Sequence, residues 1–318
     1  MDTITHGLIG VLASKSGFYQ KARKAATIAF LVGAVFPDAD VITAFFGPEF
    51  SLRYHRGITH SVIAAPFFAL ILGAIIYRFS SFKNFRFLTL MVALGTYSHI
   101  FFDLITSYGT VIFDPLSMER YSWNLVFILD PFITIPVLIG LIICWKKEKL
   151  ALRVSAALFV FLSFYLLFCL YSREAVEERL VNFTEERSLN VIKSSVYPSP
   201  LAPIFWMGVI ETDDKFYKVN MRLFGDDTRD VVEITKTDEN RFVNMAKDLR
   251  TVQLYLWFAE FPVSRYRIED SRYIVEFYDL RFGMLPNRKP FLLRVTFDKN
   301  GSLKDIYLNG RFVEEKLS

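Results

Sequence analysis

Long apolar runs occupy the first part of the chain, whereas shorter alternating runs occupy the second. A helix needs about 20 apolar residues to span a bilayer. Five runs approach or reach that length, at residues 25–46, 61–79, 87–108, 127–145 and 152–171. Residues 3–14 are too short to cross and predict a re-entrant helix that enters from one face. The pattern therefore predicts an α-helical integral membrane domain with about five spans plus a re-entrant N-terminal helix.

The pattern changes at Arg173, where an amphipathic stretch over residues 173–193 predicts a helix before a proline-rich segment. Polar and apolar residues then alternate in several runs. These runs lie at residues 215–224, 251–258, 273–278, 291–297 and 303–308. Alternation of period two predicts strands, and the Asn300-Gly301 turn predicts a hairpin. We expect a membrane domain over residues 1–172 and a soluble mainly-β (α+β) domain over residues 173–318.

Charged residues follow the same division. Residues 1–172 hold 14 Lys and Arg against 9 Asp and Glu, and residues 173–318 hold 23 against 24. The hydrophobic fraction of 53% is high for a soluble protein and supports the membrane assignment. The basic surplus lies in short loops of the first domain, so it requires no nucleic-acid partner.

The placement of the basic loop residues predicts an orientation. One face carries eleven of them: Lys15, Lys21, Arg23, Lys24, Arg78, Lys83, Arg86, Lys146, Lys147, Lys149 and Arg153. Loops on the opposite face carry Arg53, Arg56 and Arg120. Because basic loops stay in the cytoplasm, we expect a multi-pass protein of the cytoplasmic (inner) membrane with its C-terminal domain outside.

Polar residues interrupt the apolar runs at one depth. A charged side chain at the membrane centre costs about 2.5–3.5 kcal/mol by insertion scales, so each residue needs a partner. The helical rise and the predicted orientation bring the whole group to the outer half of the membrane. The group comprises all four histidines and four aspartates, namely His6, Asp38, Asp40, His55, His60, His99, Asp103 and Asp130.

A bound metal ion would explain why these polar residues lie together within apolar runs. His99 and Asp103 are four residues apart and share a helix face, and Pro37 breaks the first run beside Asp38 and Asp40. Four imidazoles and three carboxylates predict one or two divalent ions at His6, Asp38, Asp40, His55, His60, His99 and Asp103. Nitrogen and oxygen donors without thiolate suit Zn, Mn, Fe, Ni and Co alike, and zinc is the metal we expect.

Three residues are candidates for catalytic roles. Arg56 is suited to hold a phosphate or carboxylate, or to stabilise developing negative charge, although it could equally anchor the loop at the interface. Asp40 and Asp130 are candidates for the general base. Asp130 precedes Pro131, so it could instead cap the start of a helix.

Four segments carry a family resemblance. They are residues 5–10 (THGLIG), 37–40 (PDAD), 55–61 (HRGITHS) and 99–110 (HIFFDLITSYGT). Their order and spacing resemble the YdjM-type membrane-bound metal-dependent hydrolases, in the long form with a C-terminal extracytoplasmic domain. The resemblance implies a cytoplasmic-membrane protein with metal-dependent hydrolase activity. It also implies the same seven metal residues.

The sequence therefore predicts a membrane-embedded hydrolase in which metal-activated water attacks an ester or phosphoester. Membrane lipids are the expected partners, and a phospholipid or another amphiphile is the expected substrate class, because the site would lie near the headgroups. Two other readings stay open. The polar group could form an ion, proton or metal pathway in a transporter, or a structural metal could support a membrane sensor or scaffold.

Overall fold

The computed structural model describes residues 1–225, 230–236, 239–284 and 289–314. It divides into two compact units. The helical unit comprises Met1–Val41, Arg56–Glu174 and Pro198–Ile204, and the second unit comprises Ile42–His55, Ala175–Tyr197 and Phe205–Ser318.

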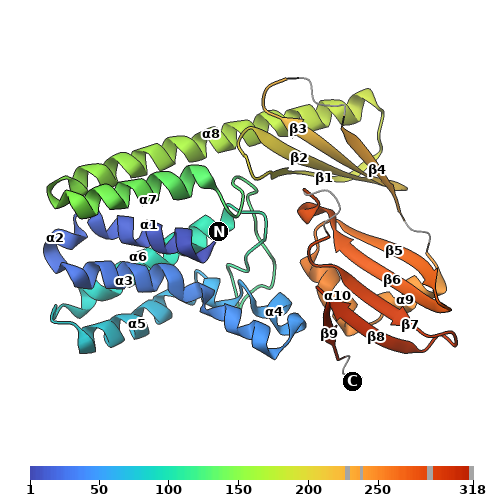
Figure 1. Cartoon of the computed structure of the whole chain (residues 1–318), viewed down its shortest axis with the longest axis horizontal. Helices are drawn as coiled ribbons and strands as arrows, with labels where there is room; N and C mark the ends of the chain where they lie inside the picture. The colour runs from blue at the N-terminus through green and yellow to red at the C-terminus, as the bar shows by residue number, and fades with distance from the viewer. Residues whose placement is uncertain (226–229, 237–238, 285–288, 315–318) are drawn as a thin grey trace. The chain divides into compact units, whose positions relative to one another are not determined.

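The helical unit is built from apolar helices of unequal length. They are α1 (Thr3–Lys15), α2 (Phe18–Ala22), α3 (Lys24–Val35), α5 (Ala65–Phe79), α6 (Phe85–Leu104), α7 (Pro131–Lys146) and the first part of α8 (Ala151–Glu186). Helices α1, α3 and α6 pack together (Figure 1). Small residues allow this approach: a Cβ on Gly33 would lie 2.2 Å from the Val92 carbonyl oxygen, and one on Gly10 would lie 2.6 Å from the Ala34 Cβ. The close packing brings the C-terminal end of α3 against the middle of α6.

The first apolar run changes its helical form where the sequence predicts a break. Helix α3 ends at Val35, and the 3₁₀-helix η1 (Phe36–Phe46) continues from it. Pro37 lacks a backbone N–H and therefore cannot extend the α-helical hydrogen bonding. The tighter 3₁₀ turn carries Asp38 and Asp40 beyond the end of α3.

Several helical segments have the length and composition of membrane spans. Within the described residues, three qualify: Lys24–Phe46, Phe85–Leu104 and Glu148–Glu186. The number rises to four if the broken pair Pro48–His60 and Ala65–Phe79 counts as one span. Helix α7 is apolar but has 16 residues. The helical membrane region is thus confirmed, whereas the count of five spans stays a prediction.

The second unit is rich in sheet. Its first sheet has the order β1-β2-β3-β4, formed by Val191–Pro198, Phe205–Thr212, Lys215–Arg222 and Val231–Thr235. Its second sheet has the order β5-β6-β7-β8-β9, formed by Pro262–Glu269, Arg272–Asp279, Leu293–Phe297, Leu303–Leu308 and Arg311–Val313. The unit also holds α4 (Pro48–Tyr54), the end of α8, α9 (Arg241–Lys247) and α10 (Arg250–Phe258), and Figure 1 labels these elements. The mainly-β prediction for this part of the chain is confirmed.

Most of the predicted strands are present. Strands β3, β6, β7 and β8 correspond to alternating runs, and β7 and β8 pair across the predicted Asn300-Gly301 turn. The prediction of a strand at residues 251–258 is wrong, because this stretch forms α10. Thr251, Val252, Tyr255 and Phe258 are its buried residues, and their spacing of three and four is that of one helix face.

Candidate metal centre

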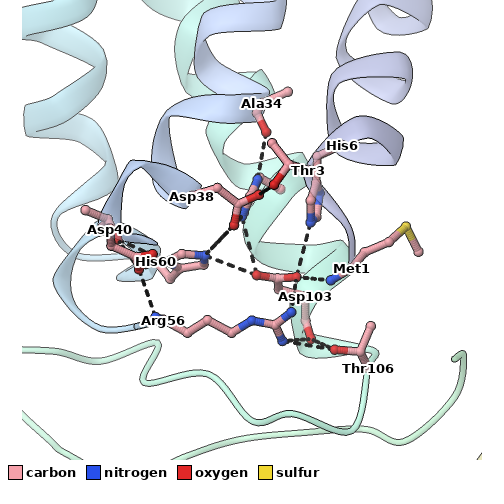
Figure 2. Close-up of polar contacts among 12 residues, drawn as sticks. Met1, Thr3, His6, Ala34, Asp38, Asp40, Arg56, His60, Asp103 and Thr106 are labelled. Atoms are coloured by element: carbon pink, nitrogen blue, oxygen red, sulfur yellow. Dashed lines mark hydrogen bonds and ion pairs between the residues drawn. The ribbon is translucent and has the colours of Figure 1, made fainter. Parts of the chain in front are cut away.

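Four side chains from three segments converge in the helical unit, and Figure 2 labels three of them, Asp38, His60 and Asp103. Asp38 lies on η1, His60 ends the 3₁₀ turn η2 (Ile58–His60), and His99 and Asp103 lie one turn apart on α6. One nitrogen or oxygen of each residue lies within 4.8 Å of those of the others. The side chains of His60, His99 and Asp103 are fully buried, and that of Asp38 is 13% exposed.

A backbone contact fixes the tautomer of His99. Its Nδ1 lies 2.7 Å from the carbonyl oxygen of Ala34 at the end of α3. Because a carbonyl only accepts, Nδ1 carries the proton and donates it. The Nε2 of the neutral ring then has a lone pair. This nitrogen lies 3.3 Å from Asp103 Oδ2 and 3.5 Å from Asp38 Oδ1.

A carboxylate fixes His60 in the same way. Its Nδ1 lies 3.2 Å from Asp40 Oδ2, to which the Thr59 hydroxyl also donates. The carboxylate accepts the Nδ1 proton, so the His60 Nε2 of a neutral ring also has a lone pair. That nitrogen lies 3.1 Å from Asp103 Oδ2 and 3.0 Å from His99 Nε2. A carboxylate or carbonyl behind a histidine is the usual support of a metal-binding imidazole.

The two oxygens of Asp103 have different surroundings. Oδ1 accepts from Arg56 Nη2 at 2.8 Å, from His6 Nε2 at 3.1 Å and from the α-amino group of Met1. Oδ2 is buried, has no hydrogen-bond donor among the described residues and faces His60 and His99. One side of the carboxylate is therefore neutralised, and the other points into the cluster.

These residues fit a divalent metal ion. With both rings neutral, two imidazole lone pairs and two carboxylate oxygens face one another without a proton between them, and this arrangement is unfavourable in a buried site. Metal bonds of about 2.0–2.2 Å in a tetrahedral site separate the ligand atoms by roughly 3.4 Å. The separations between the histidine nitrogens and their neighbours run from 3.0 to 3.8 Å. The donor set suits zinc and other divalent first-row metals.

His6 lies beside the four convergent atoms. Its ring stacks on His99 with centroids 3.7 Å apart, and its Nε2 contacts Asp103 Oδ1. Its Nδ1 is buried and has no hydrogen-bond partner among the described residues. The first turn of α1 thus places His6 against Asp103 Oδ1, the oxygen that also contacts Arg56.

Asp40 and Arg56 each contact one member of the cluster: Asp40 contacts His60, and Arg56 contacts Asp103. Asp40 Oδ2 accepts from the Arg56 backbone N–H at 2.8 Å as well as from His60 and Thr59. The Arg56 guanidinium, 3% exposed, contacts Asp103 and donates to the Thr106 hydroxyl at 3.0 Å. Arg56 adopts a φ of +61°, a conformation that is uncommon outside glycine. Its fixed contacts make it a positioning residue for Asp103.

Two further candidates, His55 and Asp130, are not among the four convergent residues. His55 follows α4, in the second unit, and its backbone N–H bonds to the Ser51 carbonyl. Asp130 caps the start of α7 through the Phe132 N–H and accepts a 2.7 Å hydrogen bond from Tyr165. These contacts give Asp130 the capping role that its position before Pro131 also predicts.

Sequence reasoning did not identify several partners in the site. Thr3 donates to Asp38 Oδ2 at 2.6 Å, Thr59 donates to Asp40, and Thr106 accepts from Arg56. Thr59 lies inside the HRGITHS segment, next to His60, and Thr3 precedes His6 by three residues on the same helix face. Those spacings are the signals that could have pointed to them.

A family model and one relative match this chain. The model of the YdjM inner membrane protein family matches residues 1–176, which include all four convergent residues. An uncharacterized protein of Bacillus subtilis (strain 168), YfhP, is 27% identical over 330 residues, covering 100% of this chain and 97% of that protein. No solved structure matches the chain.

Proposed function

This chain belongs to the YdjM inner membrane protein family, and we propose that it is a membrane-embedded, metal-dependent hydrolase. The observation that carries the proposal is the convergence of Asp38, His60, His99 and Asp103 with both Nε2 lone pairs turned inward. A bound divalent ion lowers the pKa of water toward neutrality and polarises a carbonyl or phosphoryl oxygen.

Zinc is the metal we propose for this set, with Mn, Fe, Ni and Co as alternatives. His60, His99 and Asp103 provide three ligands, so a catalytic zinc would keep its fourth position for water, with Asp38 beside it. The absence of thiolate from the four residues leaves the other divalent metals in competition. One ion suffices for the four atoms, and His6 supports them through Asp103 and the stacked His99 ring.

The surrounding residues have distinct proposed roles. Asp40 and the Ala34 carbonyl hold His60 and His99 in the required tautomers. Arg56 holds Asp103 and balances its charge within a buried environment. Asp38, at 13% exposure, is the least buried member of the set, so we assign it the role of accepting a proton from water.

A lipid or another amphiphilic ester or phosphoester is the substrate class we propose. Each of the five apolar runs contains an apolar helix, and the basic loop residues favour an outer position for the cluster. On this proposal the chain crosses the membrane five times, α1 enters from one face, and the C-terminal domain lies outside. A site near the outer headgroups would meet lipids by lateral diffusion.

The test uses the full chain purified in detergent and loaded in turn with each candidate metal. Metal content is measured by mass spectrometry, and hydrolysis is measured on mixed phospholipids and on soluble esters and phosphoesters. We expect His60→Ala and His99→Ala to lose both the bound metal and at least about 100-fold in rate, because each removes a ligand. Glu276→Gln, in the second unit, is the control and should retain both.

The outcomes distinguish a hydrolase from a transporter and from a protein with a structural metal. Turnover that follows metal content supports the hydrolase. Bound metal without turnover, together with metal flux in proteoliposomes that His60→Ala abolishes, would replace it with a transporter. Bound metal that changes only thermal stability would make the ion structural. A wild-type protein that binds no divalent metal would remove the basis of the proposal.

A further inference from the structure

A second polar feature lies at the opposite end of α1 from His6. A cavity of about 940 Å³ opens between α2 and the turn that joins α7 to α8. The lining residues of this cavity come from two stretches of the helical unit. They are Tyr19, Gln20 and Arg23 from the first stretch, and residues 146–151 from the second.

The cavity is strongly basic. Arg23, Lys146, Lys147 and Lys149 line it, against a single carboxylate, Glu148. Arg23 contacts Glu148 at 3.4 Å, but both side chains are more than 60% exposed, so the pair neutralises little of the local charge. An excess of positive charge in one hollow attracts an anion.

Two exposed apolar side chains are the sequence neighbours of the second lining stretch. Trp145, at the end of α7, is 84% exposed, and Leu152, at the start of α8, is 50% exposed. Both belong to helices with the apolar composition of membrane segments, so we expect lipid acyl chains to contact these side chains. A ligand that meets both features must carry an anionic head and an apolar tail.

We propose that this cavity, formed by α2 and the α7–α8 turn, binds the phosphate headgroup of an anionic phospholipid. Basic pockets between membrane helices favour such headgroups because several cations contact one phosphate while the acyl chains stay in lipid. The positive-inside rule accounts for basic residues at this end of the helices. It does not account for three lysines and an arginine around one hollow. The proposal is independent of the metal centre and of hydrolysis.

The experiment compares two triple variants of the full chain. Lys146→Gln, Lys147→Gln and Lys149→Gln together remove three cations from the cavity. Arg78→Gln, Lys83→Gln and Arg86→Gln remove the same charge from the α5–α6 loop and the helix ends beside it, outside the lining. Each protein is reconstituted in phosphatidylcholine with phosphatidylglycerol, and the retained lipids are identified by native mass spectrometry.

We expect wild type and the loop variant to retain phosphatidylglycerol over phosphatidylcholine. The cavity variant should lose that preference by at least tenfold, since each lysine near an anionic headgroup contributes roughly fivefold. Equal loss in both variants would overturn the proposal in favour of general surface charge. Displacement of the lipid by millimolar inorganic phosphate would also overturn it, because the occupant would then be a free anion.

Discussion

Each unit of the molecule contains a buried carboxylate surrounded by cations, Asp103 in the helical unit and Glu276 in the second unit. Glu276 on β6 contacts Arg267 and Arg294 at 2.9 Å, and both arginine side chains are more than 40% exposed. Asp103 contacts Arg56 at 2.8 Å, and that guanidinium is 3% exposed. Glu276 therefore shares its charge with partners in water, whereas Asp103 and its partner are both removed from water.

The two carboxylates also differ in how completely they are neutralised. Both arginines reach Glu276 Oε1, and Lys289 lies 3.8 Å from Oε2, so each oxygen has a permanently charged neighbour. Asp103 has its cations on Oδ1, while Oδ2 faces two imidazole lone pairs. A structural ion pair is complete without further groups. On the proposed function, a bound cation would complete the Asp103 site.

The largest expected effect comes from removing the Asp103 charge. Asp103→Asn leaves Arg56 buried without its carboxylate, so we expect the free energy of unfolding to fall by about 3–5 kcal/mol. Glu276→Gln should lower it by about 1 kcal/mol or less, because solvent takes over the exposed arginines. Denaturant titration in detergent measures both. Equal losses at the two sites would show that burial does not separate them.

Metal removal gives the next largest effect. If the ion is present at 100 times its dissociation constant, its removal lowers the free energy of unfolding by about 2.7 kcal/mol. We expect a chelator to lower the melting temperature of wild type and of Glu276→Gln alike. The chelator should leave His99→Ala unchanged, because that variant has already lost a ligand. A chelator effect that persists in His99→Ala would place the ion elsewhere.

A smaller effect, on metal affinity, is expected from Asp40, which supports His60 without being one of the four convergent residues. Asp40→Asn keeps the shape of the side chain but removes the charge that supports His60 Nδ1. Removing such a partner weakens metal affinity by about 10 to 100-fold, which competition with a fluorescent chelator can measure. Asp130→Asn is the matched control, since Asp130 is also buried but caps α7. Similar losses in the two variants would contradict a specific role for Asp40.

The sequence predicted features that depend on local spacing. The helical membrane region follows from run length, the break after α3 follows from Pro37, and the shared face of His99 and Asp103 follows from their separation. The β7–β8 hairpin follows from alternation and the Asn300-Gly301 turn. Each of these is decided within about twenty residues of chain.

Contacts between distant segments could not be predicted in the same way. Arg56 and the Asp103 backbone lie 47 positions apart in the chain, and only the fold brings the guanidinium to Asp103. His55 and His60 share one motif, but the four ligand residues include His60 alone of the two. At residues 251–258 the alternating pattern was also compatible with a helix, and packing decided between them.

The smallest effect concerns the pH dependence of the Glu276 ion pairs. Burial disfavours the ionised form, but hydrogen bonds from Arg267 and Arg294 outweigh it and hold the pKa of Glu276 below its ordinary value of 4.5. A carboxylate with a lowered folded-state pKa stabilises the fold fully above the unfolded-state pKa. That stabilisation is lost as the pH falls through the lower, folded-state value.

The measurement compares unfolding of wild type and Glu276→Gln from about pH 7 down to about pH 3. We expect a constant difference of about 1 kcal/mol or less above pH 4.5, which shrinks as the pH falls below that value. Added salt should reduce the difference at neutral pH, because the arginine partners are exposed to solvent. A difference that grows on acidification would have the wrong sign for a lowered pKa. It would remove the ion-pair account of Glu276 and with it the contrast to Asp103.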